Sequence, residues 1–197
     1  MQGLVGIERF AVMQKVTLMV NRYEIRELSA DDVVGPLLAF AQQKRMAFKE
    51  EVTFYTGEDR QTPVFSFKAR KRIDLAATYD VMDASGTPIG LFRKDFGASL
   101  LRSTWHLEAA GVAAVGQERN PTIAILRRVW EFIPILGDIP VPFLFHFDYT
   151  DGAGTVVLSS TRRRSLRDRY VVTVPGGALD GRVAAAMAVA LDALQGR

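Results

Sequence analysis

Val183-Ala184-Ala185-Ala186-Met187-Ala188-Val189-Ala190-Leu191 is a stretch near the C-terminus without a single charged or polar side chain. A helix that is apolar on every side belongs either in a protein core or in a membrane. This segment is much shorter than the roughly 20 residues that a membrane-spanning helix needs. Its many alanines make it thin, so larger side chains can surround it. The sequence therefore predicts a buried helix from Arg182 to Leu194.

The sequence before this helix alternates short strand-forming segments with turn residues. The clearest hairpin joins Thr78–Met82 to Thr87–Arg93 through Asp83-Ala84-Ser85-Gly86, because Asp bonds the local backbone and Gly accepts a positive φ. Roughly ten strands at such short intervals favour a barrel or a sandwich. Other expected elements are a hairpin of Val16–Val20 and Tyr23–Leu28 with a turn at Asn21-Arg22, a hairpin of Phe143–Tyr149 and Thr155–Ser160, a strand at Arg169–Val174, and a helix from Asn120 to Phe132.

A chain of 197 residues with 48% hydrophobic and 24% charged residues fits one globular domain, which we expect to span 1–197. In a chain built mainly of strands, the natural place for an all-apolar helix is the middle of a closed sheet. We therefore predict a mainly β fold, a closed antiparallel β-barrel around its own C-terminal helix. The alternative is an amphipathic helix lying on a sandwich.

Two parts of the sequence resemble LURP-one-related proteins, a family related to tubby C-terminal domains and phospholipid scramblases. They are Phe67–Arg72 with Tyr79–Lys94, and Tyr170–Val174 followed by the apolar helix. The resemblance implies a tubby-like barrel of about twelve strands around a hydrophobic helix. Tubby domains bind phosphoinositide headgroups through basic residues, and scramblases are membrane-associated. The calcium segment of scramblases has no counterpart here.

Sequence signatures of catalysis are weak. The chain has no cysteine, which excludes thiolate nucleophiles, disulfides and cysteine-based zinc sites. It also lacks a P-loop. We expect its two histidines, His106 and His146, to be packed or solvent-facing. The acid pairs Asp80 with Asp83 and Asp148 with Asp151 flank expected turns, which explains them more simply than acid–base work or a cation site. We therefore expect a protein that is not an enzyme and has no catalytic residue, metal or cofactor.

Basic clusters are the better functional lead, because the basic residues are clustered although the formal net charge of +3 is a modest excess. Arginine binds phosphate oxygens bidentately, so such clusters can meet anionic lipid headgroups. Alternate residues of a strand share a face, and Arg162–Arg167 is expected to form a loop. The plainer interpretation is a solvated surface that nearby acids such as Asp168 neutralise. The candidate residues are Lys68, Arg70 and Arg72, then Arg93 and Lys94, then Arg162, Arg163, Arg164 and Arg167.

The stretch Leu126–Leu136 combines arginines, a tryptophan and apolar residues. Trp at the level of the headgroups and Arg near lipid phosphates is typical of an interfacial element. Arg127, Arg128 and Trp130 are therefore candidate membrane contacts. A helix that covers one end of the barrel has the same composition and is the favoured interpretation.

Two functions remain open from the sequence. The first is a binding module for anionic lipid headgroups or membrane surfaces. The second is a protein-interaction or scaffold barrel without a small-molecule ligand, which predicts an apolar surface patch. Nucleic-acid binding has weaker support because few aromatic residues lie among the arginines. The sequence shows no secretory signal and no transmembrane segment. We expect a cytoplasmic protein, and the basic clusters leave open a peripheral association with the membrane.

Overall fold

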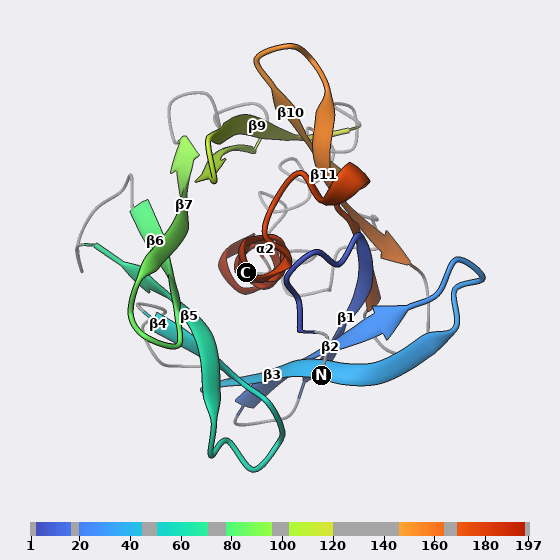
Figure 1. Cartoon of the computed structure of the whole chain (residues 1–197), viewed down its shortest axis with the longest axis vertical. Helices are drawn as coiled ribbons and strands as arrows, with labels where there is room; N and C mark the ends of the chain where they lie inside the picture. The colour runs from blue at the N-terminus through green and yellow to red at the C-terminus, as the bar shows by residue number, and fades with distance from the viewer. Residues whose placement is uncertain are drawn as a thin grey trace, which may run out of the picture.

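The computed structural model describes residues 3–16, 20–44, 51–70, 78–95, 103–119, 146–163 and 169–195. These residues form a closed antiparallel barrel of twelve strands around one helix (Figure 1). The elements are β1 (Arg9–Val16), β2 (Val20–Leu28), β3 (Val34–Lys44), β4 (Glu51–Tyr55), β5 (Pro63–Ala69), β6 (Thr78–Asp83), β7 (Pro88–Asp95), β8 (Thr104–Ala109), β9 (Val112–Glu118), β10 (His146–Asp151), β11 (Val156–Arg163), β12 (Arg169–Thr173), a 3₁₀ turn η2 (Pro175–Gly177) and α2 (Gly181–Gln195).

Each strand pairs with its neighbours in sequence, and β1 pairs with β12 to close the ring. At this seam Phe10 lies opposite Val172, and Val12 lies opposite Tyr170. Closure gives every described strand a hydrogen-bonded partner on both sides. The barrel wall therefore offers no free strand edge in the part of the chain that the structure describes.

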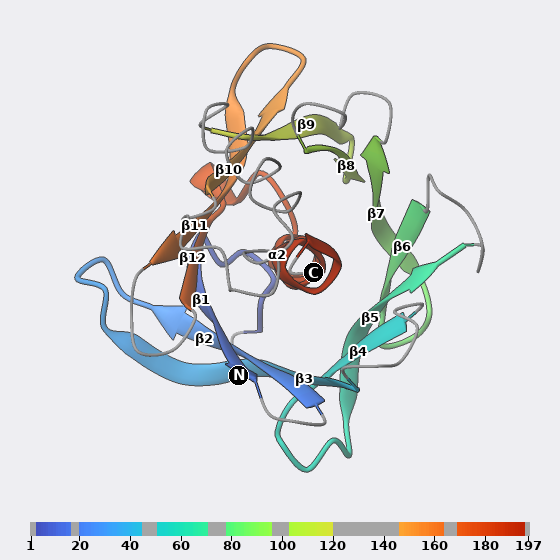
Figure 2. The same cartoon turned by 180° about the vertical axis from the view of Figure 1, so that it is seen from behind.

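The helix α2 runs through the middle of the barrel, as Figures 1 and 2 show from opposite sides. Every residue from Val183 to Leu191 is at most 6% exposed. The predicted barrel around a buried helix is thus confirmed, and the helix-on-sandwich alternative is wrong. None of the described helices is long and apolar enough to cross a membrane.

Glycines let the helix lie close to the N-terminal segment and to the barrel wall. A Cβ on Gly181 would lie 2.1 Å from the carbonyl oxygen of Leu4, and one on Gly90 would lie 3.0 Å from Cγ2 of Val183. On the wall, large aromatic rings fill the space that the alanines of α2 leave. Phe54 stacks on Phe65 with ring centroids 4.1 Å apart. The described interior is thus packed with side chains.

Local strand predictions were partly right. The hairpin at Asp83–Gly86 is confirmed, with Gly86 at φ 83°. The turn at Asn21-Arg22 is wrong, because both residues lie inside β2 and pair with Lys15 and Val16 of β1. The β8–β9 hairpin was missed; its turn is Ala110-Gly111, both at positive φ. The helix expected from Asn120 to Phe132 lies outside the described residues.

Candidate functional site

The basic residues on β5 face outward and are held by acids. Lys68 Nζ lies 3.2 Å from Glu51 on β4. Arg70, directly after β5, donates two hydrogen bonds of 2.8 and 2.6 Å to the carboxylate of Asp80. This bidentate contact raises the pKa of Arg70 above its ordinary value. The shared face predicted for Lys68 and Arg70 is present but largely neutralised, and Arg72 lies outside the described residues.

Arg93 and Lys94 on β7 do not form one surface. Side chains alternate along a strand, and Lys94 has the same parity as Phe92, which is fully buried. Lys94 Nζ lies 5.8 Å from the ring centroid of buried Trp105, a cation–π distance. Arg93 faces the other way, so the expectation of a joint cluster is wrong for these two residues.

The arginines of β11 are separated in the same manner. Arg162 and Arg163 extend the strand and pair with Tyr170 and Arg169 of β12, so the loop expected from Arg162 is wrong at its start. The guanidinium carbon of Arg162 lies 5.9 Å from the ring centroid of Tyr170. Arg163 is on the opposite face, with 55% of its side chain exposed. Arg164 and Arg167 lie outside the described residues, as do Arg127, Arg128 and Trp130.

Three arginines from three adjacent strands meet at Asp32, and we call Arg9, Arg163 and Arg169 the arginine cluster. Arg9 of β1 pairs with Asp32 Oδ1 and donates to the carbonyl oxygens of Ser29 and Ala30 at 2.5 and 3.0 Å. A guanidinium nitrogen of Arg163 lies 3.7 Å from Asp32 Oδ2. Arg169 donates to the main-chain oxygen of Asp32 at 3.2 Å. The seam between β1 and β12 brings these residues together.

The β2–β3 loop that carries Asp32 is held in place locally. Asp32 has a positive φ of 62°, which Asp tolerates better than most residues. The backbone nitrogen of Val33 donates to Ser29 Oγ at 3.1 Å. A small outer core of Ala11, Leu28 and Val171 packs beside the loop, against the outer face of β1 and β12. The loop therefore presents Asp32 at a defined position.

Charge in the arginine cluster is unbalanced. Two guanidinium groups pair with the carboxylate of Asp32 and a third contacts its main-chain oxygen. With Asp31, the exposed neighbour in the same loop, the three arginines exceed the two acids by one positive charge. The side chain of Arg163 is 55% exposed and that of Arg9 is 26% exposed, so part of the positive charge faces solvent. Lys68 and Arg70 lie on a different part of the wall, because β6 to β10 separate β5 from β11 in the ring. The described basic residues thus form separate sites rather than one.

Predicted acid pairs have two different roles. Asp83 accepts from the backbone nitrogens of Ser85 and Thr87, and these bonds together with the Ser85 hydroxyl lower its pKa. Asp151 accepts in the same way at its own turn. The turn explanation is confirmed for these two. It is wrong for their partners, because Asp80 binds Arg70, and Asp148 binds Arg119 through two contacts of 2.6 Å.

Among the described residues, neither histidine belongs to a recognisable catalytic or metal constellation. His106 Nε2 lies 3.2 Å from a carboxylate oxygen of Asp95. Burial lowers the pKa of His146, and the nearby Arg119 adds to this. No group of three or more metal-binding side chains occurs within the described ranges.

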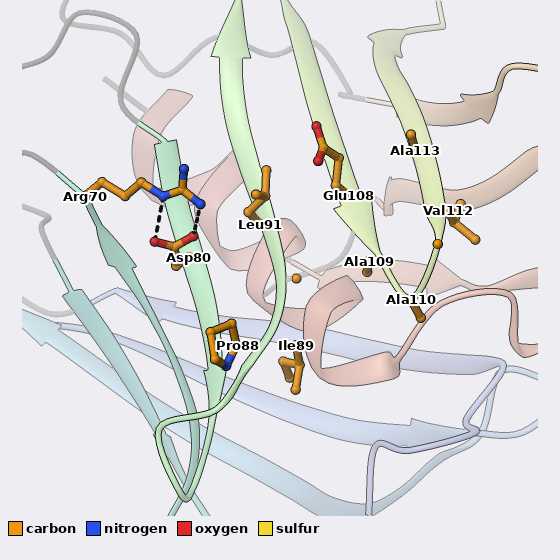
Figure 3. A pocket seen from close by; sticks show the side chains of 12 residues that line it. Arg70, Asp80, Pro88, Ile89, Leu91, Glu108, Ala109, Ala110, Val112 and Ala113 are labelled. Carbon is orange, nitrogen blue, oxygen red and sulfur yellow. Dashed lines mark hydrogen bonds and ion pairs between the residues drawn. The ribbon is translucent and has the colours of Figure 1, made fainter.

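The outer wall also carries a groove of about 610 Å³ across β6 to β9 (Figure 3). Arg70 and Asp80 stand at one side, Glu108 at the other, and Leu91 lies between them. The sequence showed no signal for this groove, because its residues come from four strands and a turn. The groove is lined by Arg70, Asp80, Pro88, Ile89, Gly90, Leu91, Glu108, Ala109, Ala110, Gly111, Val112 and Ala113.

Comparison with known proteins gives one informative match. A family model described as LURP-one-related matches residues 38–192, which cover β4 to β12, most of β3 and most of the central helix. No curated protein matches the chain, and no solved structure does.

Proposed function

Because the chain belongs to the LURP-one-related family, we propose that it is a non-enzymatic binding module, and that its arginine cluster receives the phosphate groups of anionic lipid headgroups at a membrane surface. The observation that carries this proposal is the excess of guanidinium groups around Asp32. Lys68 and Arg70, by contrast, are each matched by an acid of their own.

Guanidinium geometry supports phosphate as the ligand. Arginine presents planar pairs of donors that match two phosphate oxygens, and it keeps its charge at every physiological pH. The 3.7 Å contact of Arg163 with Asp32 is long, and more than half of the side chain is exposed. Arg163 can therefore turn towards an external phosphate without losing a strong internal bond. Arg9 makes three contacts with the β2–β3 loop, so its positive charge would stay in a fixed position.

The experiment is co-sedimentation of the protein with vesicles, once of neutral phosphatidylcholine and once with added phosphatidylserine or phosphoinositide. We expect binding only to the anionic vesicles, with an affinity that falls between low and physiological salt, because salt screens exposed charges. A soluble inositol phosphate added as competitor separates headgroup recognition from general attraction to a charged surface. Equal binding to neutral vesicles, or no binding at either salt concentration, would reject the proposal.

Charge reversal then locates the site. A basic residue near an anionic membrane contributes about 1 kcal/mol, so Arg163→Glu should cost about 2 kcal/mol, or roughly 30-fold in affinity. Lys68→Glu changes the net charge by the same amount on a distant part of the wall, and it should have much less effect. If both variants lose affinity equally, the arginine cluster is not the site.

A second function, protein interaction, is favoured by a separate observation. The groove across β6 to β9 gives the outer wall a hollow of about 610 Å³ with apolar and charged side chains along it. Such concave surfaces hold ligands or side chains of a partner. This interpretation requires no membrane, so the two candidates can be tested independently.

A further inference from the structure

The groove contains one row of side chains in register across four strands. Asp80 on β6 lies opposite Leu91 on β7, Leu91 lies opposite Glu108 on β8, and Glu108 lies opposite Ala113 on β9. Residues paired in this way project from the same face of a sheet. The row therefore alternates an acid, an apolar surface, a second acid and a small apolar surface along the outside of the barrel.

Small side chains make the hollow. Gly90, Ala109, Gly111 and Ala113 all line it. Gly90 and Ala109 face the interior, because a Cβ on Gly90 would meet Val183 of the helix and Ala109 is buried, so the open space outside comes from Gly111 and Ala113. Ala113 is exposed, so its small size leaves open space on the outer surface. The groove thus has room for side chains supplied by another molecule.

Charge distinguishes the two acids. Asp80 is occupied, because both of its oxygens accept hydrogen bonds from Arg70. Glu108 is exposed, and within the described part of the chain its carboxylate makes no ion pair or hydrogen bond. Arg70 and Asp80 cancel each other, so Glu108 gives the groove one net negative charge. This sign is opposite to that of the arginine cluster.

We propose that this groove docks an extended protein segment that carries an arginine or lysine beside apolar residues. The cationic head group pairs with Glu108, and its aliphatic stem lies over Leu91 and Ala113, since long basic side chains bury their stems on apolar surface. The closed barrel offers no strand edge for β-augmentation among its described strands, so side chains have to supply the contacts. This proposal rests on the protein-interaction function.

The test uses the full chain and five-residue peptides with blocked ends. The central residue is arginine, lysine, citrulline, leucine or glutamate, and its neighbours are both leucine or both serine. Binding is followed by amide shifts of ¹⁵N-labelled protein. We expect the arginine and lysine peptides with leucine neighbours to move the amides of Leu91, Glu108 and Ala113. Citrulline, which has the shape of arginine without its charge, should bind at least fivefold more weakly.

Variants connect this binding to the groove. Glu108→Gln keeps the shape and removes the charge, so it should weaken the arginine peptide at least fivefold and leave the citrulline peptide unchanged. Ala113→Tyr fills the groove from an exposed strand position and should weaken all leucine-flanked peptides. The matched control is Glu58→Gln, an exposed acid in the β4–β5 loop, which should change nothing.

Several results would overturn the proposal. They are shifts confined to other parts of the barrel, no preference for a cationic centre, or arginine-peptide affinity unaffected by Glu108→Gln. Vesicle binding serves as the independent readout, because Glu108→Gln leaves the arginine cluster intact. Glu108→Gln should lose peptide binding and keep vesicle binding. Arg163→Glu should lose vesicle binding and keep peptide binding, so the two readouts show which site each variant disrupts.

Discussion

The hydroxyl of Tyr170 donates a hydrogen bond to Asp192 Oδ1 across 2.5 Å, and so connects the barrel wall to its central helix. Tyr23 donates to the other oxygen of the same carboxylate at 2.9 Å. Asp192 is the only charged residue of α2 between Val183 and Leu194. Its carboxylate accepts one hydrogen bond from β2 and one from β12. A carboxylate at the rim of a packed interior needs such donors, because burial without them is costly.

Removing one donor should destabilise the barrel. We expect Tyr170→Phe to lower the free energy of unfolding by about 1.5–3 kcal/mol, the usual contribution of a hydrogen bond to a charged group. Urea denaturation followed by circular dichroism measures this change. Tyr55→Phe, at a partly exposed position on β4, is the matched control and should cost much less. Equal effects would mean that the bond to Asp192 contributes nothing specific.

Removing the hydroxyl of Tyr149 should instead raise the free energy of unfolding. Its side chain is fully buried, and no described residue bonds its hydroxyl. A buried polar group without a partner costs about 1–3 kcal/mol. Tyr149→Phe removes that group and keeps the ring, so the protein should become more stable by about 1 kcal/mol in the same urea assay. A clear loss of stability would reveal a partner for this hydroxyl.

Stability should also fall in alkaline solution. Burial and the charge of Asp192 raise the pKa of Tyr23, and burial raises the pKa of Tyr79 and Tyr149. A tyrosine in the unfolded chain loses its proton near pH 10. Because the folded state holds these protons more tightly, their contribution is complete below that pH and is lost as the pH rises above it. Tyrosinate absorbance near 295 nm should increase together with unfolding, and Tyr23→Phe should make this loss of stability less steep.

A single methyl group at Gly116 should be enough to disturb the core. A Cβ there would lie 2.1 Å from Cε1 of Tyr149, and the ring has nowhere to move in a packed interior. We expect Gly116→Ala to cost at least about 1–3 kcal/mol, as overpacking does. Gly152→Ala, where the added atom meets nothing within 4 Å, is the control. In a Tyr149→Leu background the cost of Gly116→Ala should shrink, and an unchanged cost would place the strain elsewhere.

The thinness of the central helix can be tested in the same way. Ala186 is fully buried in the middle of α2, so Ala186→Leu adds three carbon atoms where the wall leaves no room. We expect a loss of about 1–3 kcal/mol or more in the urea assay. Ala84→Leu, at the exposed β6–β7 turn, should be nearly neutral. Tolerance of leucine at Ala186 would show free space around the helix.

The architecture could be predicted because the requirement for burial is visible locally. An all-apolar helix such as Val183–Leu191 must be surrounded, and a chain of short strands has few ways to surround it. Turns with Asp and Gly, as at Asp83–Gly86, were found for the same local reason. The Ala110-Gly111 turn was missed because β9, the strand after it, contains Ala113, Ala114 and Gly116, which carry little strand signal.

The arginine cluster could not be predicted in full, because its members meet only through the β1–β12 seam. Arg9 and Asp32 lie far from Arg163 in the sequence. No local sequence pattern around these three residues predicts that they are in contact. Neighbouring charges were misleading for a related reason. Arg93 with Lys94, and Arg162 with Arg163, look like clusters in a linear sequence, but a strand sends successive side chains to opposite faces.

The order of elements has a consequence for how the protein is made. Among the described strands a ribosome synthesises β1 before the others, whereas its partner β12 follows the other eleven strands and the core-filling α2 follows β12. Until then, the inward-facing side chains of the strands lack the helix against which they pack, and β1 lacks one neighbour. Pairings between distant segments form slowly, and open edges with exposed apolar surface invite aggregation. The nascent chain is therefore most vulnerable just before β12 and α2 emerge, and chaperones that shield apolar surface would act at that stage.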